Sequence, residues 1–124
     1  MKNPKSKAPT PSNRFALPIK AVLQNLEGKP LTEPDPDVKG GIRTITLAHV
    51  LGAALMSDAK AEGLTLTVLD RYEIARRIRS GKEIEVKVGT CEQIKKLVTA
   101  AFAHAPIIAG QALELLGEEA SADL

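Results

Sequence analysis

A strictly alternating segment, KEIEVKV at residues 82–88, constrains the fold of this chain more than any other feature of its sequence. Ile84, Val86 and Val88 alternate with charged residues, which is typical of a strand with one buried face and one solvated face. A lone strand leaves its backbone hydrogen-bonding groups without partners. The segment therefore predicts a small sheet, and we expect the partner strand in the N-terminal part of the chain.

That partner is predicted within residues 15–32, FALPIKAVLQNLEGKPLT. Residues 27–30, EGKP, have the composition of a turn, which would join two short strands. Pro30 cannot donate a hydrogen bond to a ladder, so the second strand should lie at an edge. Residues 33–41, EPDPDVKGG, are predicted to form a solvated acidic loop, because they lack the series of oxygen ligands that a calcium loop needs.

Apolar residues at helical spacing predict two helices between these strands. Residues 46–59 have a stripe of apolar side chains that begins at Leu47. Residues 66–80 form the second predicted helix, and Gly81 follows it as a stop signal. Its spacing predicts that Leu69 and Tyr72 face the core.

Two more helices are predicted after the alternating strand. Thr90 and Gln93 have the spacing of a capping box, which indicates a helix from there to about residue 103. The last helix is predicted over residues 106–117, with Pro106 at its first position, where proline is favoured.

These elements predict an α+β fold, in which a small N-terminal β-hairpin and one further strand pack against about four helices. The length of 124 residues is that of one domain. We expect a disordered basic tail over residues 1–14, a single domain over 15–118 and a frayed C-terminus over 119–124. Only three residues are aromatic, so the core should be aliphatic.

The composition favours a cytoplasmic protein. The only cysteine, Cys91, cannot form an internal disulfide, which fits a reducing compartment. No stretch approaches the roughly 20 apolar residues that span a bilayer. The basic N-terminus is not followed by the apolar run of a signal peptide. We therefore expect no contact with a membrane.

Reactive side chains are too sparse in this sequence to indicate catalysis. Cys91, His49 and His104 fall short of the four ligands of a structural zinc site. In the first turn of a helix Cys91 would have a lowered pKa if it were exposed, but a packed or half-exposed cysteine without a catalytic role is the simpler interpretation. A phosphate-binding glycine motif is absent. We expect no enzyme activity, no catalytic residues, no cofactor, no metal and no small-molecule substrate.

Basic residues are concentrated in two regions. Residues 1–19 carry four basic residues and no acid, while the whole chain has a net charge of +2. A second cluster lies on the predicted helix over 66–80, where acidic neighbours dilute it. A nucleic-acid contact through phosphate neutralisation would use Lys2, Lys5, Lys7, Arg76, Arg77 and Arg79. A solvated helical face is the alternative interpretation of the arginines.

The last predicted helix, with the sequence PIIAGQALELLG, is apolar on more than one face. It has almost none of the polar side chains with which a recognition helix contacts bases. An apolar helix of this kind must be covered by its own domain or by a partner. We expect a protein partner or a second copy of the chain to bind at Ile107, Ile108, Gln111 and Leu115.

The order of several short motifs resembles that of a group of small proteins encoded by tailed phages and prophages. The matching segments are LEGKPL at 26–31, RYEIA at 71–75 and GQA at 110–112, and the resemblance covers residues 20–117. The proline-rich basic tail departs from the pattern of that group. The resemblance implies a phage-type setting in a bacterial host cell, and it implies no site residues.

Together, these features predict a non-enzymatic accessory protein that acts through protein–protein contacts and self-associates. The alternative is a nucleic-acid-associated accessory protein or regulator, which would use the basic tail and the helix that carries Arg76, Arg77 and Arg79.

Overall fold

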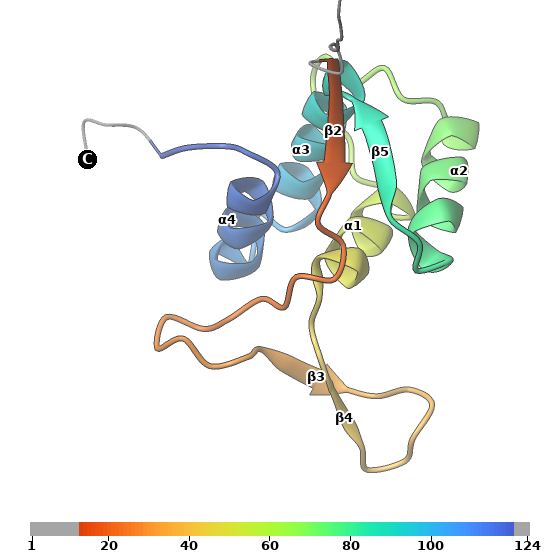
Figure 1. Cartoon of the computed structure of the whole chain (residues 1–124). Helices are drawn as coiled ribbons and strands as arrows, with labels where there is room; N and C mark the ends of the chain where they lie inside the picture. Colours follow the sequence, from red (N-terminus) through yellow and green to blue (C-terminus); the bar gives the residue numbers. More distant parts are fainter. Residues whose placement is uncertain (1–12, 121–124) are drawn as a thin grey trace, which may run out of the picture.

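The computed structural model describes residues 13–120, in which two small antiparallel sheets and four helices form an α+β fold (Figure 1). The predicted fold class is confirmed. One sheet pairs β2 with β5, and the other pairs β3 with β4. The helices gather around the first sheet, while the β3–β4 hairpin projects from the body of the molecule (Figure 1).

The alternating segment forms a strand over Ile84–Lys87 and pairs with the N-terminal region, as predicted, whereas Val88, expected on the buried face of the strand, lies outside it and is 44% exposed. β2 (Arg14–Leu17) and β5 (Ile84–Lys87) are antiparallel, with Leu17 opposite Ile84. Leu17, Ile84 and Val86 are all buried. The alternation of the sequence therefore corresponds to the two faces of this sheet.

Most of the predicted tail, residues 1–14, lies outside the described residues, and Lys2, Lys5 and Lys7 lie outside with it. Its last residue, Arg14, is the first residue of β2, so the folded part begins earlier than predicted. At the other end of the chain, residues 119 and 120 have no regular structure. Residues 121–124 of the predicted C-terminus are outside the described part.

The turn predicted at residues 27–30 is present, but it does not join two strands. The side-chain oxygen of Asn25 accepts two backbone N–H groups of this turn, at 2.9 and 3.0 Å. The flanking segments meet at a single bridge between Gln24 and Pro30. The hairpin predicted within 15–32 was therefore wrong, because β2 pairs with β5 and not with its neighbour in sequence.

The hairpin lies instead across the segment that was predicted to be a loop. β3 (Thr32–Pro34) pairs with β4 (Ile42–Thr44). Asp35 accepts the N–H of Asp37 at 2.9 Å, and Gly40 has a φ of +75°, a conformation that glycine adopts at little cost. These local features reverse the chain, so the predicted loop is the turn of a hairpin, apart from its first two residues, which belong to β3.

The first two helices are shorter than predicted. α1 covers Leu47–Leu55 and α2 covers Val68–Arg79. A capping box defines the start of α2: the hydroxyl of Thr67 accepts the N–H of Asp70 at 3.0 Å, and the Asp70 carboxylate accepts the N–H of Thr67 at 3.1 Å. These bonds satisfy backbone donors that the first turn of a helix leaves free.

α3 (Val88–Ala101) begins two residues before Thr90, so the predicted capping box was wrong. The helix follows β5 directly. Gln93, the other half of the predicted box, bonds to a distant segment instead: it accepts the N–H of Thr65 at 2.5 Å and donates to the carbonyl of Gly63 at 3.1 Å. A tertiary contact has replaced the local one.

The core is aliphatic, as the scarcity of aromatic residues predicts. α1 and α3 are packed together at its centre, in contact with α2, α4 and the β2–β5 sheet. α4 (Pro106–Leu115) begins at its proline, as predicted. The largest fully buried side chains are Leu17, Leu23, Leu47, Leu51, Leu55, Ile94, Leu97, Val98 and Leu116. Within residues 13–120, no helix has the length and apolar character that crossing a membrane requires.

α2 presents only part of its predicted apolar face to the core: Ile78, in its last turn, is buried as the spacing indicates, but the apolar residues of its first turns are not. Leu69 and Tyr72 were expected to be buried, but they are 73% and 51% exposed. Arg71 faces the body of the domain instead, where it donates to the carbonyls of Leu55 and Ser57 at the end of α1. These hydrogen bonds connect the start of α2 to the end of α1.

Candidate interaction surfaces

Large apolar side chains are exposed at the N-terminal end of α2. Val68 is 84% exposed, with Leu69 and Tyr72 beside it on the same helix, and Met56, just after α1, is 60% exposed. Single exposed apolar residues are common on protein surfaces, whereas a group of them indicates a surface that a partner covers. We call Val68, Leu69 and Tyr72 the apolar end of α2.

A groove of about 820 Å³ lies between α1, α2 and the β3–β4 hairpin. The residues of its helical walls are mostly small, and include Ala48, Gly52, Ala53 and Ala75. A Cβ added to Gly52 would meet no atom within 4 Å, so the space above this glycine is open. Met56 and Tyr72 also line the groove, which therefore adjoins the apolar end of α2. We call it the α1–α2 groove.

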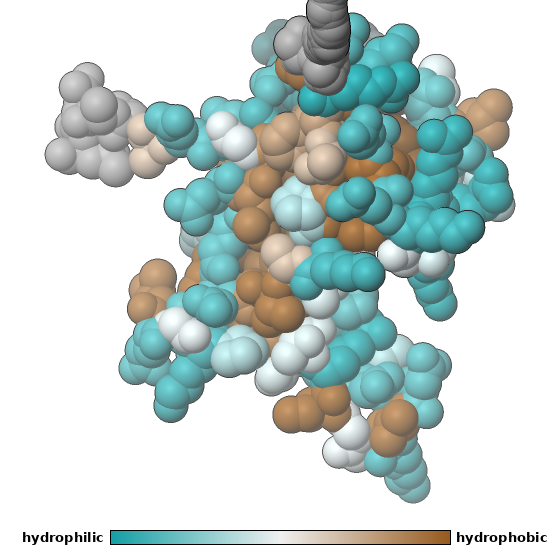
Figure 2. All heavy atoms as spheres, in the orientation of Figure 1, coloured by the Kyte–Doolittle hydropathy of each residue, from teal (hydrophilic) through white to brown (hydrophobic). Residues whose placement is uncertain are grey.

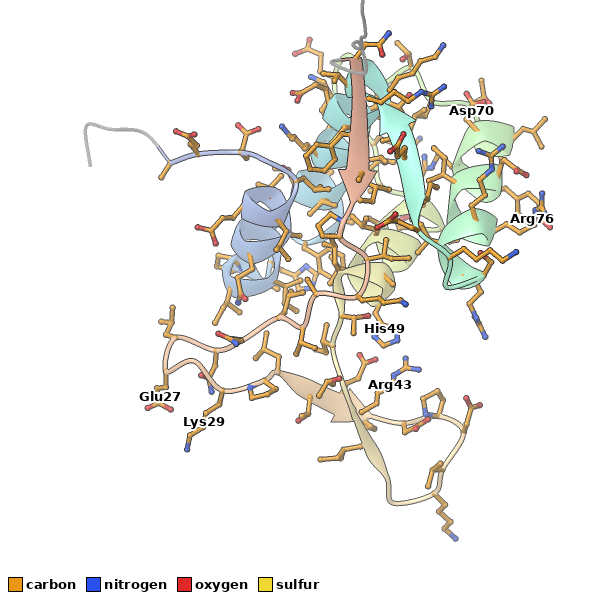
Figure 3. All side chains as sticks on the ribbon, in the orientation of Figure 1. Glu27, Lys29, Arg43, His49, Asp70 and Arg76 are labelled. Carbon is orange, nitrogen blue, oxygen red and sulfur yellow. The ribbon has the colours of Figure 1, made fainter. Side chains whose placement is uncertain are left out.

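Cationic side chains line the same groove. Its lining includes Arg43 on β4 and Arg76 and Arg79 on α2, but only one carboxylate, that of Asp37. Figure 3 shows Arg43 beside His49 at the base of the hairpin, and Arg76 on the outer side of α2. The lining of the groove thus combines apolar surface with a net positive charge, which suits an occupant that is both apolar and acidic.

Two of these arginines already have a carboxylate partner. Arg43 lies 2.6 Å from Glu33, and Arg76 lies 2.7 Å from Glu73. A guanidinium has five N–H donors, so each retains donors for a further ligand. Arg79 forms no ion pair with any residue between 13 and 120.

The β3–β4 hairpin, residues 32–44, forms an arm that extends from the helical body (Figure 1). Its turn carries the carboxylates of Asp35 and Asp37. Val38 and Ile42 are 54% and 71% exposed on it. Teal and brown atoms accordingly alternate along the lower edge of the molecule in Figure 2. We call this hairpin the arm; like the groove, it combines charged and apolar groups.

The surface predicted on α4 is largely occupied within the domain. Ile108 and Leu115 are half-buried against the core, and Ile107 is partly exposed. The side-chain amide of Gln111 bonds to the backbone of Gln24: its oxygen accepts the N–H at 2.8 Å, and its nitrogen donates to the carbonyl. The structure therefore gives these side chains contacts within the chain, and leaves untested whether a partner also binds there.

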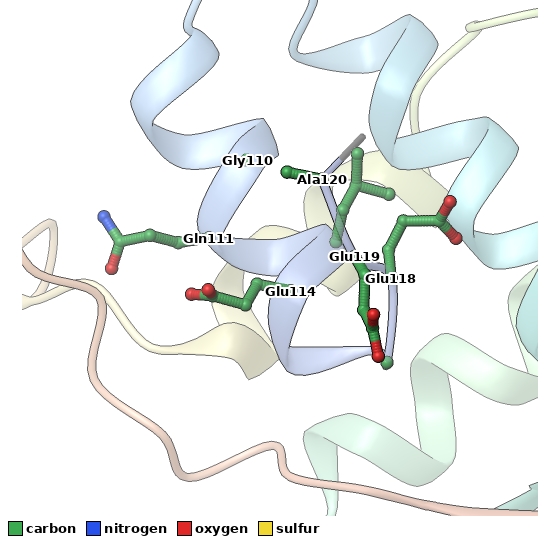
Figure 4. A pocket seen from close by; sticks show the side chains of 8 residues that line it. Gly110, Gln111, Glu114, Glu118, Glu119 and Ala120 are labelled. Atoms are coloured by element: carbon green, nitrogen blue, oxygen red, sulfur yellow. The ribbon is translucent and has the colours of Figure 1, made fainter. Parts of the chain in front are cut away.

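A second hollow, of about 740 Å³, lies beside the C-terminal turn of α4. Figure 4 shows the carboxylates of Glu114, Glu118 and Glu119 around it. Glu118 is 3.0 Å from Lys95, which also pairs with Glu92 at 2.7 Å. These two hydrogen bonds, the one to Glu92 foremost, raise the pKa of Lys95. The hollow is acidic, in contrast to the α1–α2 groove.

The basic residues of α2 that sequence analysis singled out are mostly paired. Arg76 and Arg77 both bond to Glu73, and these hydrogen bonds lower the pKa of the Glu73 carboxyl. The same carboxylate raises the pKa of Arg76. Glu73 thus offsets part of the positive charge that would attract a phosphate backbone, and leaves Arg79 as the arginine of the three with no ion pair in the described part of the chain.

The residues considered for catalysis or metal binding are not brought together. Cys91 is 3% exposed and its thiol donates to the carbonyl of Leu116, and burial raises its pKa. His49 accepts the N–H of Thr46 at 3.3 Å, while His104 stacks on Phe102. Within residues 13–120, no group of three or more His, Cys, Asp or Glu is arranged to hold a metal ion.

The α1–α2 groove is the feature that sequence analysis missed. Ala48 and Gly52 on α1 and Met56 just after it are spaced four residues apart, and all three line the groove. That spacing was a usable signal, because a row of small and apolar residues on the outer face of a helix often admits a neighbour.

Comparison of the chain with protein-family models, curated proteins and solved structures finds no match in any of the three.

Proposed function

We propose that this chain is a non-enzymatic accessory protein that acts through protein–protein contacts, in the cytoplasm of a bacterial host and in the phage-type setting that its motif order implies. The observation that supports the contacts is the exposure of Val68, Leu69, Tyr72 and Met56 beside an open groove. Burying such side chains against a partner removes their unfavourable hydration, at roughly 25 cal/mol per Å² of apolar area.

Photo-crosslinking in the cells that produce the full chain tests this proposal. A photoreactive phenylalanine analogue is placed at Leu69 or at Tyr72, and at Thr99, an exposed residue of α3, as the control. We expect protein adducts, including adducts with a second copy, from the first two positions and not from Thr99. Protein adducts no more abundant than those at Thr99 would overturn the proposal.

A nucleic-acid-associated role is the second candidate, supported by the four basic residues of segment 1–19 and by Arg79, which has no ion pair within residues 13–120. It predicts a mobility shift with DNA or RNA that weakens as salt rises, because bound cations release condensed counterions. Deletion of residues 1–12 and the substitution Arg79→Ala should each weaken the shift. A chain that causes no shift at low salt contradicts this role.

A further inference from the structure

The arm and the α1–α2 groove have complementary chemistry. Residues 33–41 of the arm contain three acidic residues and one lysine, which gives this segment a net charge of −2. The groove is lined by three arginines, of which Arg79 has no ion pair in the described part of the chain. The arm also exposes Val38 and Ile42. The arm is therefore acidic and the groove basic, and both expose apolar side chains. Each surface could pair with the charge of the other and cover its apolar area.

The arm of the same chain does not fill the groove. Asp37 reaches its edge, yet the space above Gly52 is open and the groove retains about 820 Å³. Ile42, on the arm, and Met56, in the groove, stay 71% and 60% exposed. Within residues 13–120, no segment covers these apolar groups.

We infer that the arm of one chain docks in the α1–α2 groove of a second copy, so that two copies form a reciprocal dimer. This inference rests on the proposed function and names the partner. The arm and the groove adjoin each other, because Pro36, Asp37 and Arg43 belong to the arm and also line the groove. A two-fold axis beside this junction brings the arm of each chain to the groove of the other chain at the same time. The assembly is then a closed dimer, with no free arm or groove left for a third copy.

A second copy fits this surface better than a nucleic acid does. Phosphates would satisfy Arg79, but they would leave Met56, Tyr72 and the arm's Ile42 exposed. A second copy provides carboxylates and apolar side chains in the same short segment. In the dimer we place Asp37 of one chain opposite Arg79 of the other.

The mass of the full chain in solution tests the dimer. Light scattering coupled to gel filtration should give twice the 13.2 kDa of one chain at high concentration, with a lower mass on dilution. Arg79→Glu and Asp37→Arg each place like charges in contact, and each should raise the dissociation constant at least about tenfold. Asp37→Arg keeps the turn, since the bond to Asp35 uses the backbone N–H of residue 37.

A mixture of the two variants separates contacts between chains from contacts within one chain. If Asp37 and Arg79 meet between chains, the equimolar mixture of Arg79→Glu and Asp37→Arg chains forms a heterodimer of near wild-type affinity, because one interface is unchanged and the other has exchanged charges. If they meet only within a chain, mixing changes nothing. Circular dichroism confirms that both variants fold.

Ile42→Ser provides a second route if a charge variant fails to fold, because this exposed side chain is not part of the core. It should weaken the dimer at least about threefold, as the loss of an interface side chain does. A wild-type chain that is monomeric at all concentrations overturns the inference. Crosslinks from Tyr72 to other proteins would then still support the proposed function, whereas adducts to nucleic acid alone would overturn both.

Discussion

α4, and α2 beside the α1–α2 groove, differ in how the composition of a helix relates to the exposure of its apolar side chains. α4 is the more apolar of the two by sequence, yet Ala109, Ala112 and the adjacent Leu116 are buried in the core, and Gln111 is bonded to Gln24. α2 is rich in charged residues, yet its first turns expose large apolar side chains. The apolar content of a helix therefore does not show whether its own domain or a partner covers it.

The largest effect on the free energy of unfolding should come from a substitution in the buried residues at the end of α4. Leu116→Ala removes a side chain that is 1% exposed. The free energy of unfolding should fall by about 2–5 kcal/mol, since a cavity remains in the core. Urea denaturation followed by circular dichroism measures the change. A loss below about 1 kcal/mol would mean that α4 is less firmly part of the core than its burial indicates.

Gln111→Ala should have an intermediate effect. It removes the two hydrogen bonds to the backbone of Gln24, which connect α4 to the segment before the Asn25 turn. A loss of about 1 kcal/mol in the free energy of unfolding is expected, because water can replace part of these bonds at this exposed position. The same denaturation assay applies. If the variant loses dimer without losing stability, Gln111 belongs to a partner interface, as the sequence predicted.

Leu69→Ser should have the smallest effect on stability. The side chain is 73% exposed and contributes little to the core, so the free energy of unfolding should change by less than about 0.5 kcal/mol. Thermal unfolding at low protein concentration measures the monomer alone. Destabilisation above about 1.5 kcal/mol would show that the apolar end of α2 is a part of the core and not a free surface.

The sequence predicts those parts of the fold that depend on a local pattern. The alternation of residues 82–88 predicted β5, its burial and its N-terminal partner strand, and the proline at 106 predicted the start of α4. The exposure of Leu69 and Tyr72 could not be predicted this way. At this end of α2 the contact with α1 is made by Arg71, through hydrogen bonds to carbonyls at the end of α1 that no local pattern indicates.

The arm and the groove could not be predicted from the sequence, because both depend on contacts between separate segments. Residues 33–41 have the composition of a loop, and only the pairing of the short strands around them makes the segment an arm. The groove involves α1, α2 and the arm together, so no single segment indicates it. The scarcity of reactive side chains indicated that Cys91 has no catalytic role. The burial of Cys91 agrees with its interpretation as a packed cysteine.

Two matched glycine substitutions decide between the groove and α4 as the surface of the self-association that we propose. Gly52 lies in the groove and Gly110 on the outer face of α4, and a Cβ at either would meet no atom within 4 Å. Leucine at each position should leave the fold intact and stabilise its helix by about 0.5–1 kcal/mol. Measured by light scattering at equal concentration, Gly52→Leu should be monomeric and Gly110→Leu dimeric; a dimeric Gly52→Leu chain beside a monomeric Gly110→Leu chain would contradict the account.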